Sequence, residues 1–356
     1  MKRTASILIM SAILLVSGWP AAAGTVTGLT TFTAGTPAKA AEVNGNFTAV
    51  KTAVDDNDAR IAALEALVAA LDSRIDALEA KLASVSTTTV NGNPTVRFSG
   101  VNVQVVNGLG STTTANGTGN VIIGYDEAHL FLGINICSIG THPTDNTPVT
   151  DETTCTAVGG TWGHDFKTGS HYLVSGRRNS YSRWGGIVGG DNNSATYNFA
   201  SVLGGQSNMA GGPMSVVSGG TSNKAIGNLS SISGGSGNTA SGGGASVTGG
   251  FLNTASGSNA QIAGGRDNSA TAEYSQIGGG NNNIASADSA SVSGGQSNTA
   301  SGGGASVSGG SGNIASGLSS HVSGGSGNTA SHTHSSILGS TNQDSTFNAE
   351  TIPALP

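Results

Sequence analysis

The chain has 356 residues and a formal net charge of −6 at pH 7, and 10% of its residues are charged, 4% are aromatic and 57 are glycine. So few large side chains exclude an ordinary globular core, and any order must come from repetition. The acidic balance excludes nucleic acid as a partner, because affinity for nucleic acid comes mainly from neutralising phosphates.

The first 23 residues are typical of a cleavable secretory signal, with two basic residues, an apolar run and three alanines ending at Ala23. An apolar run of about ten residues cannot cross roughly 30 Å of hydrocarbon, and we expect no transmembrane segment in the mature chain. That chain should begin near Gly24, with residues 24–46 as an attachment segment. We expect it to be secreted, or held at the cell surface of a bacterium of the Gram-negative type.

Residues 47–86 show the heptad pattern of a coiled-coil stalk, with apolar residues at alternating spacings of three and four. The a positions are Phe47, Val54, Ile61, Val68, Ile75 and Leu82, and the d positions are Val50, Asn57, Leu64, Leu71, Leu78 and Val85. Almost six unbroken heptads favour a coiled coil over a lone amphipathic helix on a globular core.

Two short segments of this stalk predict how many helices associate. Both resemble the trimerisation pattern of arginine, an apolar residue, two variable residues, an apolar residue and glutamate. The residues are Arg60, Ile61, Leu64 and Glu65 in the first segment and Arg74, Ile75, Leu78 and Glu79 in the second. The arginine would reach the glutamate of a neighbouring helix while its methylenes cover the seam. We expect a homotrimer, although β-branched residues at a with leucine at d favour dimers in the simplest rule.

Residues 87–125 connect the stalk to the repeats and should begin the β-structure. Residues 95–98 and 101–105 alternate as strands do, and residues 119–124 have the pattern of a first solenoid coil.

Residues 126–167 interrupt the repeat pattern and form an insert. Cys137 and Cys155 lie in it, and in an exported chain two cysteines favour one disulfide over a zinc site, which needs four ligands. Insertions in repeat stacks often form the binding surface. Trp162 and Trp184 are therefore candidate ligand contacts. The alternative, that both indoles pack the insert against the repeats, stays open.

Residues 168–343 repeat with a period of fifteen, and residues 344–356 follow as a tail. The recurring residues are a glycine pair from Gly189 and Gly190 to Gly324 and Gly325, an asparagine from Asn193 to Asn328, an alanine from Ala195 to Ala330, and a valine or isoleucine from Ile187 to Val322. A disordered linker would not keep this register, so the period predicts a β-solenoid. Stacked coils would form an asparagine amide ladder beside a narrow apolar interior. One large apolar residue per coil buries little, so we expect three such ribbons to pack together.

The segments 291–302 and 306–317 contain Ser-Val-Ser-Gly-Gly-Xaa-Xaa-Asn-Thr-Ala-Ser-Gly, with Ile for Thr in the second. They resemble the head repeats of trimeric autotransporter adhesins, in whose stalks an asparagine at d, as at Asn57, is also familiar. The resemblance implies a trimeric left-handed parallel β-roll that binds matrix or cell-surface ligands. The chain departs from the family because its stalk precedes its head and no barrel-forming strands follow the repeats.

The repeats carry no sequence pattern for catalysis or for a cofactor. Acidic residues are sparse, the glycine pairs lack the ending of a phosphate loop, and calcium-binding repeats are missing. His321, His332 and His334 are the only group from which we would build a metal site, and its ligand geometry is unconstrained.

The sequence thus predicts an all-β solenoid, a trimeric parallel β-roll of fifteen-residue coils, preceded by an α-helical coiled-coil stalk. We expect an exported fibre or adhesin-like protein for surface display and attachment, without catalysis. Two alternatives remain open. One is a purely structural fibre or spacer, and the other is a solenoid that binds ice or carbohydrate.

Overall fold

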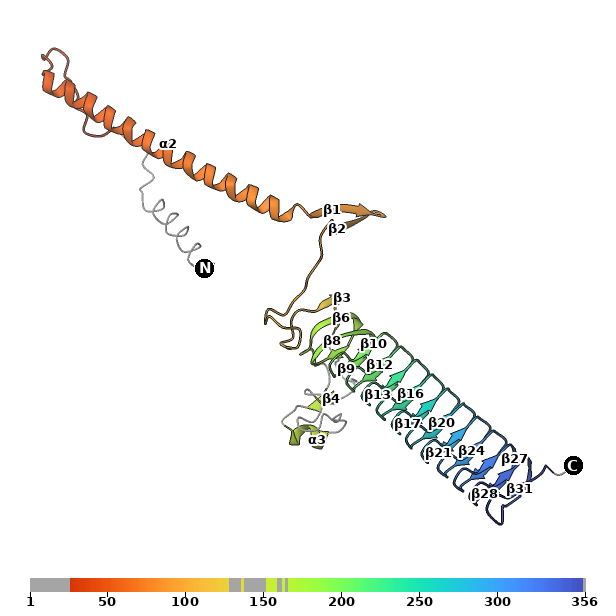
Figure 1. Ribbon diagram of the computed structural model, residues 1–356. Helices are drawn as coiled ribbons and strands as arrows, with labels where there is room; N and C mark the ends of the chain where they lie inside the picture. The colour runs from red at the N-terminus through yellow and green to blue at the C-terminus, as the bar shows by residue number, and fades with distance from the viewer. Residues whose placement is uncertain (1–25, 128–135, 138–151, 159–161, 164–165, 355–356) are drawn as a thin grey trace. The chain divides into compact units, whose positions relative to one another are not determined.

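The computed structural model describes residues 26–127, 136–137, 152–158, 162–163 and 166–354. They fall into two units, Met1–Val103 and Gln104–Pro356, and each is described by itself (Figure 1). The predicted signal, residues 1–23, lies outside the described residues. Within the described ranges, no helix combines the length and the apolar character that a membrane span requires.

The first unit is dominated by α2 (Ala40–Leu82), a single helix of 43 residues. Alanine, leucine, glutamate and lysine, all strong helix formers, supply much of its length, and Glu42 and Lys81 suit the partial charges of its two ends. It ends where a run of β-branched residues begins. The predicted end of the stalk at residue 86 was wrong. Val85, predicted at a d position, is the first residue of a strand.

The chain before α2 folds back along the helix. The Asn46 side chain joins the two, because its Oδ1 accepts from the Thr30 N–H at 2.7 Å and its Nδ2 donates to the Thr30 carbonyl at 3.0 Å. Ala53 is the one buried residue of the helix. In the segment expected for attachment, residues 24–46, the part from Ala40 onward is helical, and Thr30 before it is hydrogen-bonded to the helix.

Strands β1 (Val85–Val90) and β2 (Asn93–Phe98) form an antiparallel hairpin after α2. Asn91 and Gly92 make its two-residue turn with φ of 49° and 82°, the left-handed pair that tight hairpins favour. The strand predicted at residues 95–98 is confirmed. The strand predicted at residues 101–105 is wrong. Alternation gives a segment two faces, but a strand also needs a neighbour to accept its backbone hydrogen bonds, and β1 and β2 pair only with each other.

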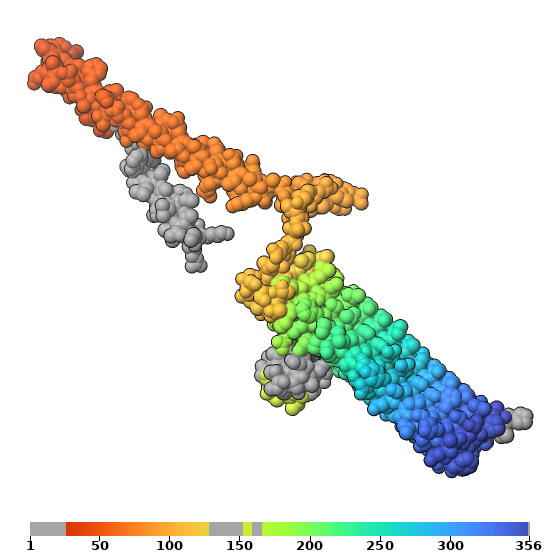
Figure 2. Space-filling view, viewed as in Figure 1, coloured from red at the N-terminus to blue at the C-terminus, as the bar shows by residue number. Residues whose placement is uncertain are grey.

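The second unit is a parallel β-solenoid, as predicted. One sheet of 14 strands contains β3 (Val121–Ile123), β6 (Ser170–Arg177), β8 (Trp184–Asp191), β10 (Ser201–Val202), β12 (Val216–Val217), β14 (Ser231–Ile232), β16 (Ser246–Val247), β18 (Gln261–Ile262), β20 (Gln276–Ile277), β22 (Ser291–Val292), β24 (Ser306–Val307), β26 (His321–Val322), β29 (Ser336–Ile337) and β31 (Thr351–Ile352). Figure 2 shows the coils as one unbroken column of atoms from green to blue.

A second sheet of 11 strands lies across the narrow interior. It contains β7 (Ser180–Tyr181), β9 (Ser194–Ala195), β11 (Met209–Ala210), β13 (Lys224–Ala225), β15 (Thr239–Ala240), β17 (Thr254–Ala255), β19 (Ser269–Ala270), β21 (Ile284–Ala285), β23 (Thr299–Ala300), β25 (Ile314–Ala315) and β28 (Thr329–Ala330). Single bridges from Asp191 to Ser326 make a third side, which ends in the pair β27 (Gly325–Ser326) and β30 (Ser340–Thr341).

The fifteen-residue register is regular in most of the solenoid and shorter at its start. Val292 pairs with Val307, fifteen residues later. Val174, Val188 and Val202 pair at steps of fourteen. Our placement of Ile187 in the interior column was therefore wrong: Val188 is buried, while Ile187 is 38% exposed. A shift of one residue turns every side chain of a strand to the other face.

Four columns of side chains fill the interior, and sequence reasoning identified three of them. The valines and isoleucines, the alanines and the asparagines are buried as predicted. The fourth column consists of Ala200, Ser215, Ser230, Ala245, Ala260, Ser275, Ala290, Ala305, Ser320 and Ser335, all buried. Its signal is the small residue two positions before each valine or isoleucine. The extra column means that each coil buries more than the sequence estimate assumed.

The asparagines form a ladder, but one made mainly with the backbone. Asn283 donates from Nδ2 to the carbonyls of Gly279 at 2.8 Å and Gly295 at 3.0 Å, and its Oδ1 accepts from the Asn298 N–H at 3.0 Å. Side chains bond directly to each other only at some steps, such as Asn253 to Asn238 at 3.2 Å. Each buried side-chain amide thus hydrogen-bonds to a carbonyl in its own coil and to backbone groups in the next coil.

The two glycines of each pair have different roles. Gly295 has a φ of 86°, and a Cβ there would lie 2.2 Å from the Gly310 carbonyl oxygen and 2.5 Å from Asn298 Nδ2. Its side chain must be hydrogen, because the asparagine ladder occupies that space. The preceding Gly294 has no atom within 4 Å of where its Cβ would be. The second glycine is therefore a requirement of the coil, and the first faces open space.

The expected tail is part of the solenoid. Thr351 pairs with Ser336, and Thr329 bridges to Asp344, so the tail residues form one further coil of the stack. The backbone N–H of Gln343 donates to Asn328 Oδ1 at 2.9 Å and continues the ladder without an asparagine. Backbone pairing holds this coil although its sequence has lost the repeat.

Candidate functional site: surfaces of the helix and of the insert

Helix α2 presents a continuous apolar stripe to solvent. The residues at the heptad a and d positions are between 43% and 71% exposed, and they are Phe47, Val50, Val54, Ile61, Leu64, Val68, Leu71, Ile75, Leu78 and Leu82. Fully burying one such side chain contributes about 1.5 to 3 kcal/mol. An exposed apolar stripe of this length is typical of an interaction surface.

The residues of the predicted trimerisation pattern lie along this stripe. Ile61, Leu64, Ile75 and Leu78 form part of it, and Glu65, Arg74 and Glu79 are exposed beside it. Arg60 and Asn57 are half-buried on the helix. The stripe therefore offers apolar side chains flanked by both signs of charge, the arrangement that a coiled coil requires.

The insert contributes few described elements, namely β4 (Ile136–Cys137), α3 (Glu152–Ala157) and β5 (Trp162–Gly163). Strand β4 pairs antiparallel with β5. Cys155 on α3 is buried and disulfide-bonded. The side chains of Cys137 and Trp162 lie outside the described residues, so the pairing of the two cysteines and the ligand contact of Trp162 stay predictions.

Trp184 begins β8 in the first sheet of the solenoid and is half-buried. Its indole Nε1 is buried and has no hydrogen-bond partner among the described residues. A ring held in this way suits packing better than capture of a ligand, which needs an accessible edge or face. Whether Trp184 contacts a ligand or packs the insert against the solenoid stays a prediction.

An ion pair joins the two ends of the insert. Lys167 Nζ lies 3.1 Å from Asp126 Oδ2, and the Asp126 side chain is 3% exposed. The other oxygen, Asp126 Oδ1, accepts from the Asn179 N–H at 2.9 Å, just as Asn179 accepts from Asn193 at 3.0 Å. Asp126 therefore takes the first place in the asparagine ladder. We had assigned both Asp126 and Lys167 to the insert, but each belongs to the solenoid.

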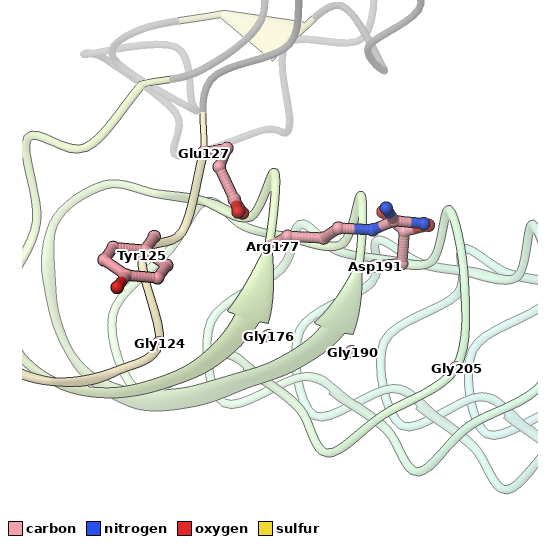
Figure 3. Close-up of a pocket in the computed structure, with 8 residues that line it drawn as sticks. All are labelled: Gly124, Tyr125, Glu127, Gly176, Arg177, Gly190, Asp191 and Gly205. Carbon is pink, nitrogen blue, oxygen red and sulfur yellow. The ribbon is translucent and has the colours of Figure 1, made fainter.

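A shallow groove lies beside this ion pair (Figure 3). Its floor is a row of glycines, Gly124, Gly176, Gly190 and Gly205, each with a positive φ. Tyr125, 94% exposed, and Glu127 stand on one side, and Arg177 and Asp191 stand on the other.

The charged side of the groove is held in place by ion pairs. Arg178 contacts Asp191 with both Nε, at 2.8 Å, and Nη2, at 2.7 Å, while Arg177 reaches the same carboxylate at 3.1 Å. A carboxylate held by two guanidiniums is fixed in direction. The groove combines a fixed carboxylate, an exposed aromatic ring and backbone groups, and sequence reasoning missed it because its residues are spread over four coils.

The histidines do not form a metal site. Within the described residues, no group of three or more His, Cys, Asp or Glu is arranged to hold a metal ion. His321 has both ring nitrogens near hydroxyls, with Nδ1 2.6 Å from Ser306 Oγ and Nε2 3.0 Å from Ser323 Oγ. Its imidazole is thus engaged in the serine rows of the first sheet.

Comparison with known proteins does not assign a family. No protein-family model matches the chain, and no curated protein matches it significantly. The class that the fold defines is a parallel β-solenoid with a long helix before it in the chain.

Proposed function

We propose that three copies of the chain associate through α2 into a coiled-coil stalk carrying three solenoids, and that this exported fibre serves surface display and attachment. The exposed apolar stripe of α2 carries the proposal. A helix with such a stripe is stabilised when other copies cover it, and identical chains supply identical stripes. The arginine and glutamate residues beside the stripe favour three helices, and the resemblance of the repeats to adhesin heads points to the same assembly.

The attachment surface in this proposal is the insert together with the groove at its base. The rest of the solenoid repeats small polar side chains, whereas this end gathers Tyr125, three basic residues and three carboxylates. Varied, partly exposed groups beside a loop are better suited to recognise a ligand than a uniform row of serines.

A structural spacer is the second candidate, and the side chains along the second sheet favour it. On the second sheet, the residue before each buried alanine changes from the buried Met209 through Lys224 and Thr239 to Ile284, so no single chemistry is maintained. That irregularity suits a spacer and disfavours ice binding, which would need a regular face.

The mass of the purified chain in solution tests the assembly. Light scattering should give three times the chain mass, and changing Ile61, Leu64, Ile75 and Leu78 to Ser should reduce it to one chain. The matched control changes Ala62, Ala66, Ala69 and Ala77 to Ser at positions away from the stripe, and it should keep the threefold mass. A monomeric parent protein would refute the trimer.

Replacing residues 128–165 with a short Gly-Ser linker separates adhesion from spacing. Asp126 and Lys167 remain in this variant, so the ladder and its ion pair are kept. An adhesin should lose binding to cells or matrix proteins while keeping its mass and β-sheet signal. Unchanged binding would mean that the attachment surface lies outside the insert. A parent chain that binds neither cells nor matrix proteins would favour the spacer.

A further inference from the structure

The β1–β2 hairpin has one apolar and one polar face. Directly opposed residues share a face, so Val85 with Phe98, Thr87 with Val96 and Thr89 with Pro94 form the first. The second contains Ser86 with Arg97, Thr88 with Thr95 and Val90 with Asn93, and it holds the only charge of the two strands. This segregation is the pattern of a sheet that is buried on one side only.

The described chain leaves the apolar face of the hairpin uncovered. Val96 is 58% exposed and Phe98 is 53% exposed. The hairpin has two strands and pairs with no other strand. Two-stranded sheets are marginal in water unless something packs on their apolar face. The hairpin therefore requires a partner for this face.

The connection to α2 limits where that partner lies. The apolar stripe of the helix ends at Leu82, two residues connect it to Val85, and the Ser99 N–H donates to the Ser84 carbonyl at 2.8 Å to close the base of the hairpin. The three residue steps from Leu82 to Val85 span at most about 11 Å. In the coiled coil proposed above, Leu82 of each chain lies against the common axis, so the three hairpin bases lie close to it and to one another.

The spacing of apolar residues also continues from helix to strand. Leu82 occupies an a position, and Val85 follows at the spacing of the next d position. Val85 lies on the apolar face of the hairpin, opposite Phe98. One apolar surface thus runs from the helix stripe onto the hairpin.

We propose that three hairpins, one from each chain, pack the faces of Val85, Val96 and Phe98 together around the axis, as a six-stranded collar at the end of the coiled coil. The partner is two further copies of this chain, and the inference rests on the proposed trimer. The collar covers the exposed valine and phenylalanine side chains and leaves Arg97 in water. It also prevents the last turns of the three helices from separating.

Cysteine cross-linking of the full chain tests the collar. Val96→Cys lies on the inner face, and Thr95→Cys, one residue away, lies on the outer face. A short bismaleimide should join chains carrying Val96→Cys and not those carrying Thr95→Cys. Since one reagent joins two of three chains around the axis, at most about two thirds of the chains become linked. The unmodified chain gives the background from the native cysteines.

Light scattering of the same samples separates the two proposals. A trimer linked at residue 96 and not at residue 95 supports the collar. A trimer without linking at residue 96, or with equal linking at both positions, overturns the collar and leaves the trimer standing. A monomer overturns both. If Val96→Cys does not fold, Thr87→Cys and Thr88→Cys repeat the comparison on the opposite strand.

Discussion

Each buried asparagine of the solenoid connects three successive coils. The Asn283 backbone N–H donates to Asn268 Oδ1 in the coil before, while its side chain bonds to Gly295 and Asn298 in the coil after. Aspartate can replace asparagine only at the first place, where Asp126 has Lys167 beside it. In the interior of the column a carboxylate would face carbonyl oxygens and could donate no hydrogen bond.

Changing Asn283 to Ala should lower the free energy of unfolding by about 2 to 4 kcal/mol. The change removes one bond to each of the Gly279 and Gly295 carbonyls and one from the Asn298 N–H, and each such loss costs about 1 kcal/mol or more. The control is Asn281→Ala, two residues away in the same coil and exposed. Urea unfolding followed by circular dichroism measures the difference, and equal effects at the two positions would contradict the ladder.

At the scale of the elements, Tyr172 on β6 closes the first end of the interior. Its hydroxyl lies 2.9 Å from the Ser182 carbonyl and 3.2 Å from the Tyr197 carbonyl, and its ring is 5.3 Å from that of Tyr181. Burial raises the pKa of Tyr172 well above its ordinary value near 10. Burial, and secondly the charge of Asp126, also raises the pKa of Tyr181.

These shifts predict a loss of stability at high pH. A group whose pKa is raised on folding contributes its full stabilisation below the unfolded pKa, here about 10, and loses it as the pH rises toward the folded value. Tyr172→Phe should therefore show a smaller loss of stability between about pH 9 and pH 11 than the parent chain. Tyr274→Phe, whose ring is exposed, should behave as the parent. Urea unfolding at pH 9 and at pH 11 measures the change in the free energy of unfolding. An equal change in the parent chain and in both variants would contradict the prediction.

The predictability of these elements depended on how many residues carried each signal. The helix and the coils were predicted because their patterns recur over many turns, so one irregular position does not hide the periodicity. The short segment at residues 101–105 had the alternation of a strand but no pairing partner. Asp126 was missed because a single acidic residue, separated from its ladder by the insert, carries no periodic signal. The groove was missed because four coils contribute to it.

At the scale of the whole chain, each coil of the solenoid contacts chiefly its two neighbours in the stack. Pairings such as Ala285 with Ala300 and Ala300 with Ala315 repeat the same register along the second sheet. Stability in such arrays is approximately a sum over coils and their interfaces. The number of coils is therefore free to vary, while the length of one coil is fixed.

Deleting residues 281–295, one full coil, should leave a folded solenoid. Gly280 then precedes Gln296, and every column of the interior keeps its register. Deleting residues 281–288 removes about half a coil and places Asn298 opposite Ser275 and Ala300 opposite Ile277, so that variant should lose its cooperative unfolding and part of its β-sheet signal. Circular dichroism with thermal unfolding compares the two, and equal damage from both deletions would contradict the modular interior.

The direction of the hydrogen bonds between coils has a mechanical consequence. Bonds such as that from the Ser291 N–H to the Ala305 carbonyl, at 2.9 Å, run from one coil to the next, across the strands. Tension applied between the two ends would load successive coils in series, so the weakest interface opens first and the others stay closed. Each opened coil releases about 50 Å of extended chain. Under flow, the solenoid would act as an extensible tether that absorbs load by lengthening in steps.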